Sequence, residues 1–349
     1  MEKKHILSGD LQGRDALELS RTLGDFFQKS DKILIDFKEV QSMTPFAMIF
    51  IISQLRNYRK NGKEISILNS DVSLSGNDKM NFFGELLKKE NSIIKAHKNS
   101  TSIPVTHVIK KDIIGSGIIT RNDAGELVNN YATKITNSFL SNVKYSEFLF
   151  DIIQYSTREL IRNIIEHSDA KYFLFCADYN KKTHTAEICI SDNGMGIYET
   201  LKSNPFLLGL KPDNFLKYSC LPGISGNRNL YSGISSNNIW ENSGFGLYMI
   251  RRICQDYGGF FLISNNHGLY RGRDSDCSSK RLDRKLEIPD TCGTTIRLNI
   301  NIDTIKNQSI LKNDLSRYIR EAEKYKKYHE ELVINPSMAS QMLQRDFKK

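Results

Sequence analysis

The stretch that decides this fold is Glu159-Leu-Ile-Arg-Asn163-Ile-Ile-Glu-His167, which is followed by Asp192-Asn-Gly-Met-Gly196. Positions four apart lie on one face of a helix, so Glu159, Asn163 and His167 form one polar stripe. The apolar residues around the stripe are predicted to be core: Ile152, Ile153, Leu160, Ile161, Ile164 and Ile165. Burying polar side chains without partners costs roughly 2 kcal/mol or more each. We therefore expect a polar ligand to meet this stripe.

The bulk composition limits the class of protein. A chain of 349 residues suggests two domains, or one large domain with an appendage. Hydrophobic residues make up 39% and charged residues 26%, which is typical of a globular protein in water. The longest apolar run, Phe46 to Ile52, is far shorter than the ~20 residues of a membrane span and predicts a core helix.

The N-terminus and the cysteines indicate a compartment. Met1-Glu-Lys-Lys-His5 opens onto no apolar stretch of the signal-peptide type. The cysteines include no Cys-x-x-Cys pair, and their spacing is typical of neither a disulfide framework nor a zinc site. They are Cys176, Cys189, Cys220, Cys254, Cys277 and Cys292. These features predict a cytoplasmic protein that does not bind a membrane.

The formal net charge of +9 raises the question of a nucleic-acid partner. Two polar regions concentrate the basic residues, a loop from Arg271 to Lys285 and a tail from Arg317 to Lys349, but acidic residues interrupt both. Segments of mixed sign are usually solvated faces or helix pairs. Nucleic acid is therefore not the favoured partner, and the positive charge would equally serve a protein that binds ATP.

The first hundred residues alternate strand and helix signals. Strands are predicted at Lys32 to Phe37 and Glu64 to Leu68, and a helix at Asp15 to Gln28. A further helix between the strands starts at the N-cap Thr44, followed by Pro45, and closes at Asn61-Gly62. Strands separated by helices imply a sheet with helices packed against it.

This order, and the sequence around Val40 to Ala47, resemble a STAS domain, the fold of anti-sigma factor antagonists. The resemblance covers residues 1–110. Members that act as phosphorylation switches carry an Asp-Ser-x-Gly type motif at the start of the helix, where this chain has Met43-Thr44-Pro45-Phe46. Thr44 is therefore interpreted as a helix cap, and phosphorylation of its hydroxyl is the alternative.

The rest of the chain is also mixed in secondary structure, and no internal repeat is visible. Helices are predicted at Asn77 to Glu90, as two patterns between Leu127 and Ser168, and at Leu247 to Tyr257. Strands are predicted at Tyr172 to Asp178, Thr185 to Ser191, Phe260 to Ser264 and Thr294 to Ile300, and Ile103 to Ile109 is predicted as a strand or an extended connector.

Glycine motifs mark three ends of these elements. Glycines after Asp192 let the backbone turn sharply and approach a ligand closely. A strand-end aspartate can accept a hydrogen bond from an exocyclic amine such as that of adenine, while Ile197 could cover one face of the base. Glycines in Ser243-Gly-Phe-Gly246 precede a helix, whose free N–H groups and dipole favour phosphate, although a flexible loop is the alternative. Thr294 could join Asp192 at the base, or be an ordinary strand residue.

The order of these motifs resembles the GHKL ATPases, the family of gyrase, mismatch-repair proteins, heat-shock chaperones and histidine kinases. The matches are Glu159 and Asn163 in the N box, Asp192, Gly194 and Gly196 in the G1 box, Gly244 and Gly246 in the G2 box, and Gly293-Thr294 in the last box. The resemblance covers residues 130–302. It implies a GHKL (Bergerat) α/β sandwich that holds ATP between helices and an antiparallel-rich sheet.

Site roles follow from the resemblance by position. Asn163 would hold Mg²⁺ through its amide oxygen, Glu159 would activate the attacking hydroxyl, and Asp192 would read adenine. The other residues expected at the nucleotide are Gly194, Gly196, Ile197, Gly244, Phe245, Gly246 and Thr294. His167 has two interpretations. An acid, an Asn and a His at this spacing resemble the catalytic helix of the anti-sigma factor serine kinases; otherwise His167 is a satisfied residue near a helix end.

The segment from Ile197 to Gly244 is longer than the lid of a small serine kinase and is expected to order over bound nucleotide. Lys217 and Arg228 in this lid could pair with phosphate. An autophosphorylating histidine kinase needs an acceptor His on a helix before the ATPase region. The candidate helix, Val128 to Phe150, has no His, which argues against that class.

We therefore expect a STAS-like domain at 1–110, a linker at 111–129, a GHKL ATPase domain at 130–302 and a helical, basic tail at 303–349. The first hypothesis is a Mg²⁺-ATP-dependent Ser/Thr protein kinase of the anti-sigma, partner-switching type, with a STAS-like or other regulatory protein as partner. The alternative is an ATPase whose lid closure gates partner binding or homodimerisation, with Gln308 to Lys349 as an interaction arm. A scaffold that binds ATP without turnover is disfavoured by the intact Glu159.

Overall fold

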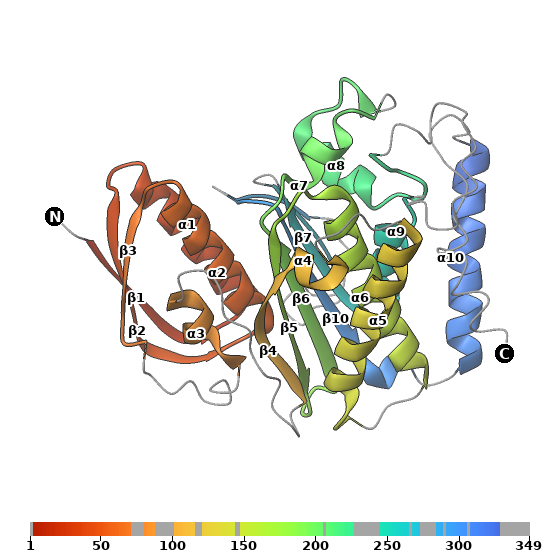
Figure 1. The fold of residues 1–349 in the computed structure, drawn as a ribbon, viewed down its shortest axis with the longest axis horizontal. Coiled ribbons are helices and arrows are strands. Elements are labelled where there is room, and N and C mark those ends of the chain that lie inside the picture. The colour runs from red at the N-terminus through yellow and green to blue at the C-terminus, as the bar shows by residue number, and fades with distance from the viewer. Residues whose placement is uncertain are drawn as a thin grey trace.

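Two sheets of different kinds organise the molecule (Figure 1). The computed structural model describes residues 3–70, 80–87, 101–115, 121–143, 147–204, 207–226, 244–264, 267–272, 284–288, 291–305 and 308–328. Within them, the N-terminal sheet is parallel and the second is antiparallel, so the chain is mixed α/β as expected. None of the described helices is long and apolar enough to cross a membrane.

The N-terminal unit is a small parallel sheet with two long helices on one side (Figure 1). Its elements are β1 (Lys3–Leu11), α1 (Gly13–Phe27), β2 (Lys32–Met43), α2 (Pro45–Lys60), β3 (Glu64–Leu68) and α3 (Phe82–Leu87). The strand order is β1-β2-β3. The predicted strands and helices of this region are therefore present, and β1 is an addition that the sequence pattern did not reveal.

Helix α2 begins as predicted. The Thr44 hydroxyl accepts a hydrogen bond from the backbone N–H of Ala47 at 3.3 Å, and Pro45 occupies the first helical position. The cap interpretation of Thr44 is thus confirmed. Every residue from Pro45 to Ile52 is buried, because α2 lies between the two sheets (Figure 1). A helix that is apolar all round needs such a position.

The second unit is built on the antiparallel sheet, whose strand order is β4-β5-β6-β10-β7-β8-β9. Its strands are β4 (Ser102–Ile109), β5 (Tyr172–Asn180), β6 (Thr185–Asp192), β7 (Gly258–Ser264), β8 (His267–Gly272), β9 (Arg284–Glu287) and β10 (Thr294–Asn301). Its helices are α4 (Lys110–Ile114), α5 (Arg121–Leu140), α6 (Glu147–His167), α7 (Gly196–Leu201), α8 (Pro212–Ser219), α9 (Gly246–Tyr257) and α10 (Gln308–Tyr328). Helices α5, α6 and α9 cover the face of the sheet opposite to α2 (Figure 1).

The two units share a hydrophobic core across α2. Side chains of Val105, Leu174 and Cys189 from the antiparallel sheet belong to the same buried cluster as Phe46 and Phe50 of α2. Polar contacts fix the register of this junction. The Phe46 N–H donates to Glu187 Oε1 at 3.0 Å, and the Ser53 hydroxyl donates to Ser191 Oγ at 2.8 Å. The N-terminal unit is therefore not tethered by a linker alone.

Several segments differ from the expected boundaries. Strand β4 lies within the range expected for the N-terminal domain, yet it is the edge strand of the antiparallel sheet, and α4 and the start of α5 occupy the expected linker. The helix expected at Asn77 to Glu90 is present only as α3 (Phe82–Leu87) among the described residues; positions 77–79 and 88–90 lie outside them. The helix expected from Val128 to Phe150 ends at Leu140, and α6 starts at Glu147.

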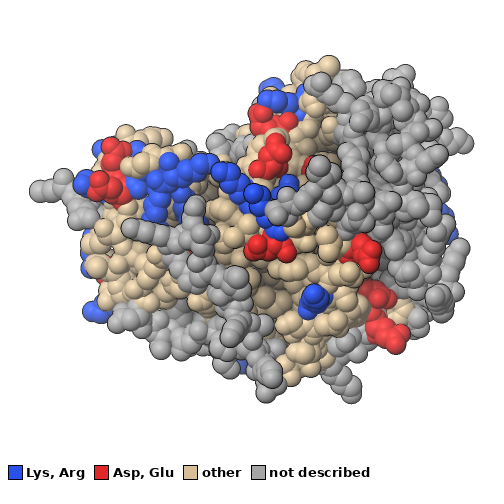
Figure 2. All heavy atoms as spheres, in the orientation of Figure 1, with Lys and Arg blue, Asp and Glu red and all other residues tan. Residues whose placement is uncertain are grey.

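The two basic regions are described only in part, because residues 273–283 and 329–349 lie outside the described residues. The region from Arg271 to Lys285 was predicted as a loop, but Arg271 lies on β8, and Arg284 and Lys285 lie on β9, because neighbouring strands supply pairing partners. The tail was expected to be helical, and its basic part is described as far as residue 328 within α10, which packs on α9. On the face drawn in Figure 2, a band of Lys and Arg side chains runs over the N-terminal unit towards its junction with the antiparallel sheet.

Candidate functional site

A cavity of about 100 Å³ opens between α6, the start of α9 and the ends of strands β6 and β10. Residues that line it are Leu160, Asn163, Ile164, His167, Ser168, Ile190, Asp192, Gly196, Ile197, Thr200, Leu201, Ser219, Ile224, Ser225, Gly226, Gly244, Gly246, Leu247, Thr294 and Ile296. Four motifs that are far apart in sequence therefore meet at one cavity.

Helix α6 contributes the polar stripe and its apolar surroundings. Asn163 and His167 line the cavity, and His167 is the last residue of the helix. Five of the six isoleucine and leucine residues expected in the core are buried, and Ile165 is partly buried against it. The turn that carries Asp192 is tied to the end of this helix. The Met195 N–H donates to Ser168 O at 2.8 Å, and the Thr200 hydroxyl donates to the carbonyl of His167 at 3.2 Å.

Glu159, the third member of the stripe, is not part of the cavity lining. Its residue is only 2% exposed, and Oε1 lies 3.1 Å from the guanidinium of Arg158 and 4.0 Å from that of Arg162. Arg162 also donates to Glu166 Oε1 at 2.8 Å. The other carboxylate oxygen of Glu159, Oε2, lies beside Gly246; a Cβ added to Gly246 would be 2.6 Å from it. Glu159 is thus held in ion pairs directly behind the start of α9.

The two arginines that pair with Glu159 do not line the cavity, and their burial was not predicted from the sequence. Arg158 and Arg162 are 5% and 4% exposed, and both lie on a helix that is otherwise mostly apolar. A buried guanidinium needs a carboxylate partner. Part of the signal was present in the sequence, because Arg162 follows Glu159 at the i,i+3 spacing of helical ion pairs.

Asp192 is at the end of β6, where it lines the cavity and the residue is 5% exposed. Burial raises the pKa of Asp192 to about 7, although backbone N–H groups of Gly194 and Thr294 oppose this by hydrogen bonding to the carboxylate. The Gly194 N–H lies 2.8 Å from Oδ1. A carboxyl that titrates near neutrality in an apolar cavity is a candidate for ligand recognition.

The glycines near Asp192 are needed for close backbone packing. A Cβ on Gly194 would lie 1.9 Å from Ser168 O, and one on Gly293 would lie 2.1 Å from Asp192 O. Gly194 does not line the cavity; it lets the turn approach the end of α6. Gly196 does line it, with φ of 81°, and is followed by Ile197, whose N–H donates to Ser264 Oγ at 2.8 Å.

Gly244 and Gly246 bring the start of α9 to the cavity. Gly244 has φ of 71°, and a Cβ there would lie 2.2 Å from the carbonyl oxygen of Ile224. Gly246 is the first residue of α9, so its helix N-terminus lies at the cavity wall. Phe245 between them does not line the cavity; its ring is buried and packs edge-on against Tyr248, with centroids 6.3 Å apart.

The lid is described only in part. Ile224, Ser225 and Gly226 reach the cavity wall, whereas Lys217 is not in the lining. Arg228 and the remainder of the lid to residue 243 lie outside the described residues. Among the described residues, no three or more His, Cys, Asp or Glu side chains gather as a metal site.

No protein-family model matches the chain, and no curated protein matches it in sequence.

Proposed function

We propose that this chain binds Mg²⁺-ATP in the cavity and uses it for a regulatory reaction, as the GHKL resemblance implies. The observation that carries the proposal is the meeting of Asn163, Asp192, Thr294 and the start of α9 around one cavity. These residues come from four motifs whose order in the sequence carries the resemblance.

The walls of the cavity suit a nucleobase. Ile164, Ile190, Ile197 and Ile296 present apolar surface, and Asp192 is the buried carboxylate among them. A base would lose water against the apolar walls and donate its exocyclic N–H to the ionised carboxyl. Such a donor would lower the pKa of Asp192 from about 7, because it stabilises the charged form.

The start of α9 suits the phosphates. Gly246 and Leu247 line the cavity, and the first backbone N–H groups of a helix have no partner within that helix. Together with the helix dipole they favour an anion. A side chain at Gly244 would clash with the backbone of Ile224, and one at Gly246 would clash with the carboxylate of Glu159, so glycine at both positions lets the start of α9 pack closely.

A magnesium ion fits the residues present only together with the nucleotide. Asn163 offers an amide oxygen at the cavity wall, and Mg²⁺ usually completes its shell with phosphate oxygens and water. When bound, the ion would neutralise phosphate charge during phosphoryl transfer. Asn163 would hold it in place.

Transfer of the γ-phosphate to a protein hydroxyl is the favoured outcome of the reaction. It is supported by His167, which lines the cavity beside Asn163 with a side chain that is 24% exposed. A histidine within reach of the bound nucleotide could take part in proton transfer from an acceptor hydroxyl. This is the Ser/Thr protein kinase hypothesis, with a regulatory protein as acceptor.

An ATP-gated conformational ATPase is the second candidate, favoured by two observations. Glu159 is buried in ion pairs with two arginines, so its carboxylate must be released before it can act as a base. In addition, the N-terminal unit shares a core with the antiparallel sheet, so it is an integral part of the molecule rather than an exchangeable partner. In this candidate, a structural change on ATP binding would free Glu159.

The fate of the γ-phosphate distinguishes the two. The full chain is incubated with γ-labelled ATP and Mg²⁺, with and without STAS-like acceptor proteins, and label is followed in protein and in free phosphate. Labelled protein supports the kinase, and free phosphate alone supports the ATPase. If equilibrium dialysis finds no Mg²⁺-dependent ATP binding, the proposed function is wrong.

A further inference from the structure

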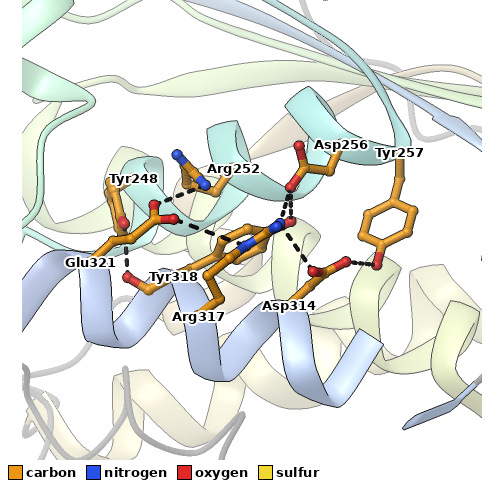
Figure 3. A network of polar contacts seen from close by, with 8 residues as sticks. All are labelled: Tyr248, Arg252, Asp256, Tyr257, Asp314, Arg317, Tyr318 and Glu321. Carbon is orange, nitrogen blue, oxygen red and sulfur yellow. Dashed lines mark hydrogen bonds and ion pairs between the residues drawn. The ribbon is translucent and has the colours of Figure 1, made fainter. Parts of the chain in front are cut away.

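Helix α9 carries a second stripe, on the side that faces α10. Tyr248, Arg252 and Asp256 are spaced four apart and therefore lie on one face of α9. Figure 3 shows this face against α10, whose side chains point towards it. Each member of the stripe makes a polar contact with α10, so the contact extends along most of α9.

Charge pairs join the two helices. Arg252 of α9 lies 2.8 Å from Glu321 Oε2 of α10. In a second pair the acid is on α9 and the base on α10: Asp256 and Arg317 are 2.6 Å apart (Figure 3). Asp256 also accepts a hydrogen bond from the hydroxyl of Tyr318 at 2.6 Å. Charge-assisted hydrogen bonds of this length are stronger than neutral ones.

Tyrosines complete the contact. The Tyr248 hydroxyl donates to the backbone carbonyl of Tyr318 at 2.8 Å, and the Tyr257 hydroxyl donates to Asp314 at 2.5 Å. The ring of Tyr318 is fully buried, and the guanidinium of Arg252 lies 4.8 Å from its centroid. Because the buried ring of Tyr318 is surrounded by directed polar contacts, α10 packs on α9 in one defined position.

The same helix α9 begins at the proposed phosphate site. Gly246 lines the cavity, two residues before Tyr248. The opposite side of α9 is fixed by buried Met249, Ile250 and Ile253 in the main core. Helix α10 is therefore the second support of α9, and any shift of α9 along its apolar support would move the N–H groups at its start.

We propose that α10 is a positioning element of the nucleotide site. By packing against Tyr248, Arg252 and Asp256, α10 holds α9 in the position in which the N-terminus of α9 binds the phosphates of ATP. This rests on the proposed function. Arg317 and Glu321 have side chains that are 45% and 41% exposed, so the charge pairs weaken as salt screens them. By linkage, ATP must strengthen the docking of α10 by the same factor by which docking strengthens ATP binding.

A charge exchange in the full chain tests the proposal. Arg252→Glu and Glu321→Arg each place like charges together, and we expect each to weaken ATP binding about fivefold or more, measured with a fluorescent ATP analogue and Mg²⁺. The double variant restores the opposite pair and should recover most of the affinity. Arg320→Glu is the matched control, because Arg320 lies on the exposed face of α10.

Hydrogen exchange of residues 313–322 reports docking independently of ATP. Tyr318→Phe removes one hydroxyl without charge reversal and serves if the charge variants do not fold. Faster exchange with unchanged ATP affinity in a folded variant would overturn the proposal. Absence of ATP binding in the unmodified chain would instead refute the proposed function, and this inference with it.

Discussion

Helices α2 and α6 lie on opposite faces of the same antiparallel sheet, and both are largely buried. Helix α2 meets the sheet with an unbroken apolar run from Phe46 to Ile52. Helix α6 instead carries arginine, glutamate, asparagine and histidine among its buried isoleucines. The apolar composition of α2 requires only an apolar surface to pack against. Burying the polar side chains of α6 costs stability unless each has a partner, so a ligand site is expected beside α6 and not beside α2.

Removing a large side chain from α2 should have the largest effect. Phe50 is 1% exposed and its ring stacks on Phe46 with centroids 5.4 Å apart. We expect Phe50→Ala to lower the free energy of unfolding by about 4 kcal/mol, since a cavity is left between the two sheets. Urea denaturation measures this. If the loss is under 1 kcal/mol, α2 is not packed as described.

Removing the amide of α6 should act on the ligand rather than on the fold. Asn163→Ala should reduce Mg²⁺-ATP affinity by at least about 100-fold, which corresponds to about 2.7 kcal/mol. The melting temperature should change little, because Asn163 lies at the cavity wall. Isothermal titration calorimetry measures the affinity, with Asn142→Ala at an exposed position as control. Unchanged ATP affinity in Asn163→Ala would remove this residue from the site.

Neutralising the buried carboxylate of α6 should separate binding from turnover. We expect Glu159→Gln to bind ATP but to lose about 100-fold in turnover, because a general base contributes at least this much. Glu159→Ala should behave likewise, with greater loss of stability because Arg158 then lacks its partner at 3.1 Å. Phosphate release under single-turnover conditions is the measurement. Normal turnover in either variant would exclude Glu159 as the base.

The pH dependence of binding tests Asp192. Its pKa is about 7 in the folded chain, against an ordinary value of 3.8, so folding favours the protonated carboxyl. The resulting cost to stability is absent below pH 3.8, grows as the pH rises and is complete above pH 7. Binding of an amine donor requires the ionised form. ATP affinity should therefore rise up to about tenfold per pH unit below 7 and level off above it.

Affinity measured from pH 5.5 to 8.5 checks this expectation, with Asp192→Asn as the control for titration of ATP itself. The same slope in both proteins would show that Asp192 does not contact the donor.

The smallest effect is expected at the junction between α2 and the sheet. Ser53→Ala removes the 2.8 Å hydrogen bond to Ser191, which lies next to Asp192. We expect about 1 kcal/mol less stability and ATP affinity within twofold of the unmodified chain. Thermal denaturation and the same binding assay are sufficient. A large loss of ATP affinity would mean that the face of the sheet covered by α2 also contributes to the site, contrary to the difference between α2 and α6.

Local features of the chain could be predicted from the sequence because their signals are local. Capping by Thr44, the buried face of α6 and the glycines before α9 each depend on neighbours within a few positions. The meeting of Asn163, Asp192, Gly246 and Thr294 was reached through the order of motifs, since no single motif specifies it.

Features set by distant partners could not be predicted. The period of a strand does not tell which strand it pairs with, so β4 was included in the N-terminal domain, and Arg271 of β8 and Arg284 and Lys285 of β9 were taken as loop. The ion pairs of Glu159 with Arg158 and Arg162 were missed for another reason, because helical spacing gives the face of a residue but not the rotamer of its side chain. The packing of α10 on α9 could not be predicted because it depends on residues from both helices.

The core shared across α2 has a consequence for synthesis on the ribosome. The chain is made from the N-terminus, so α2 emerges well before strands β5 and β6 at residues 172–192. Until those strands are made, Phe46 and its neighbours have no sheet to cover on their second side. Exposed apolar surface on such an intermediate favours aggregation. Folding of the N-terminal unit during translation is therefore expected to pause, or to require a chaperone, until about two hundred residues have been released.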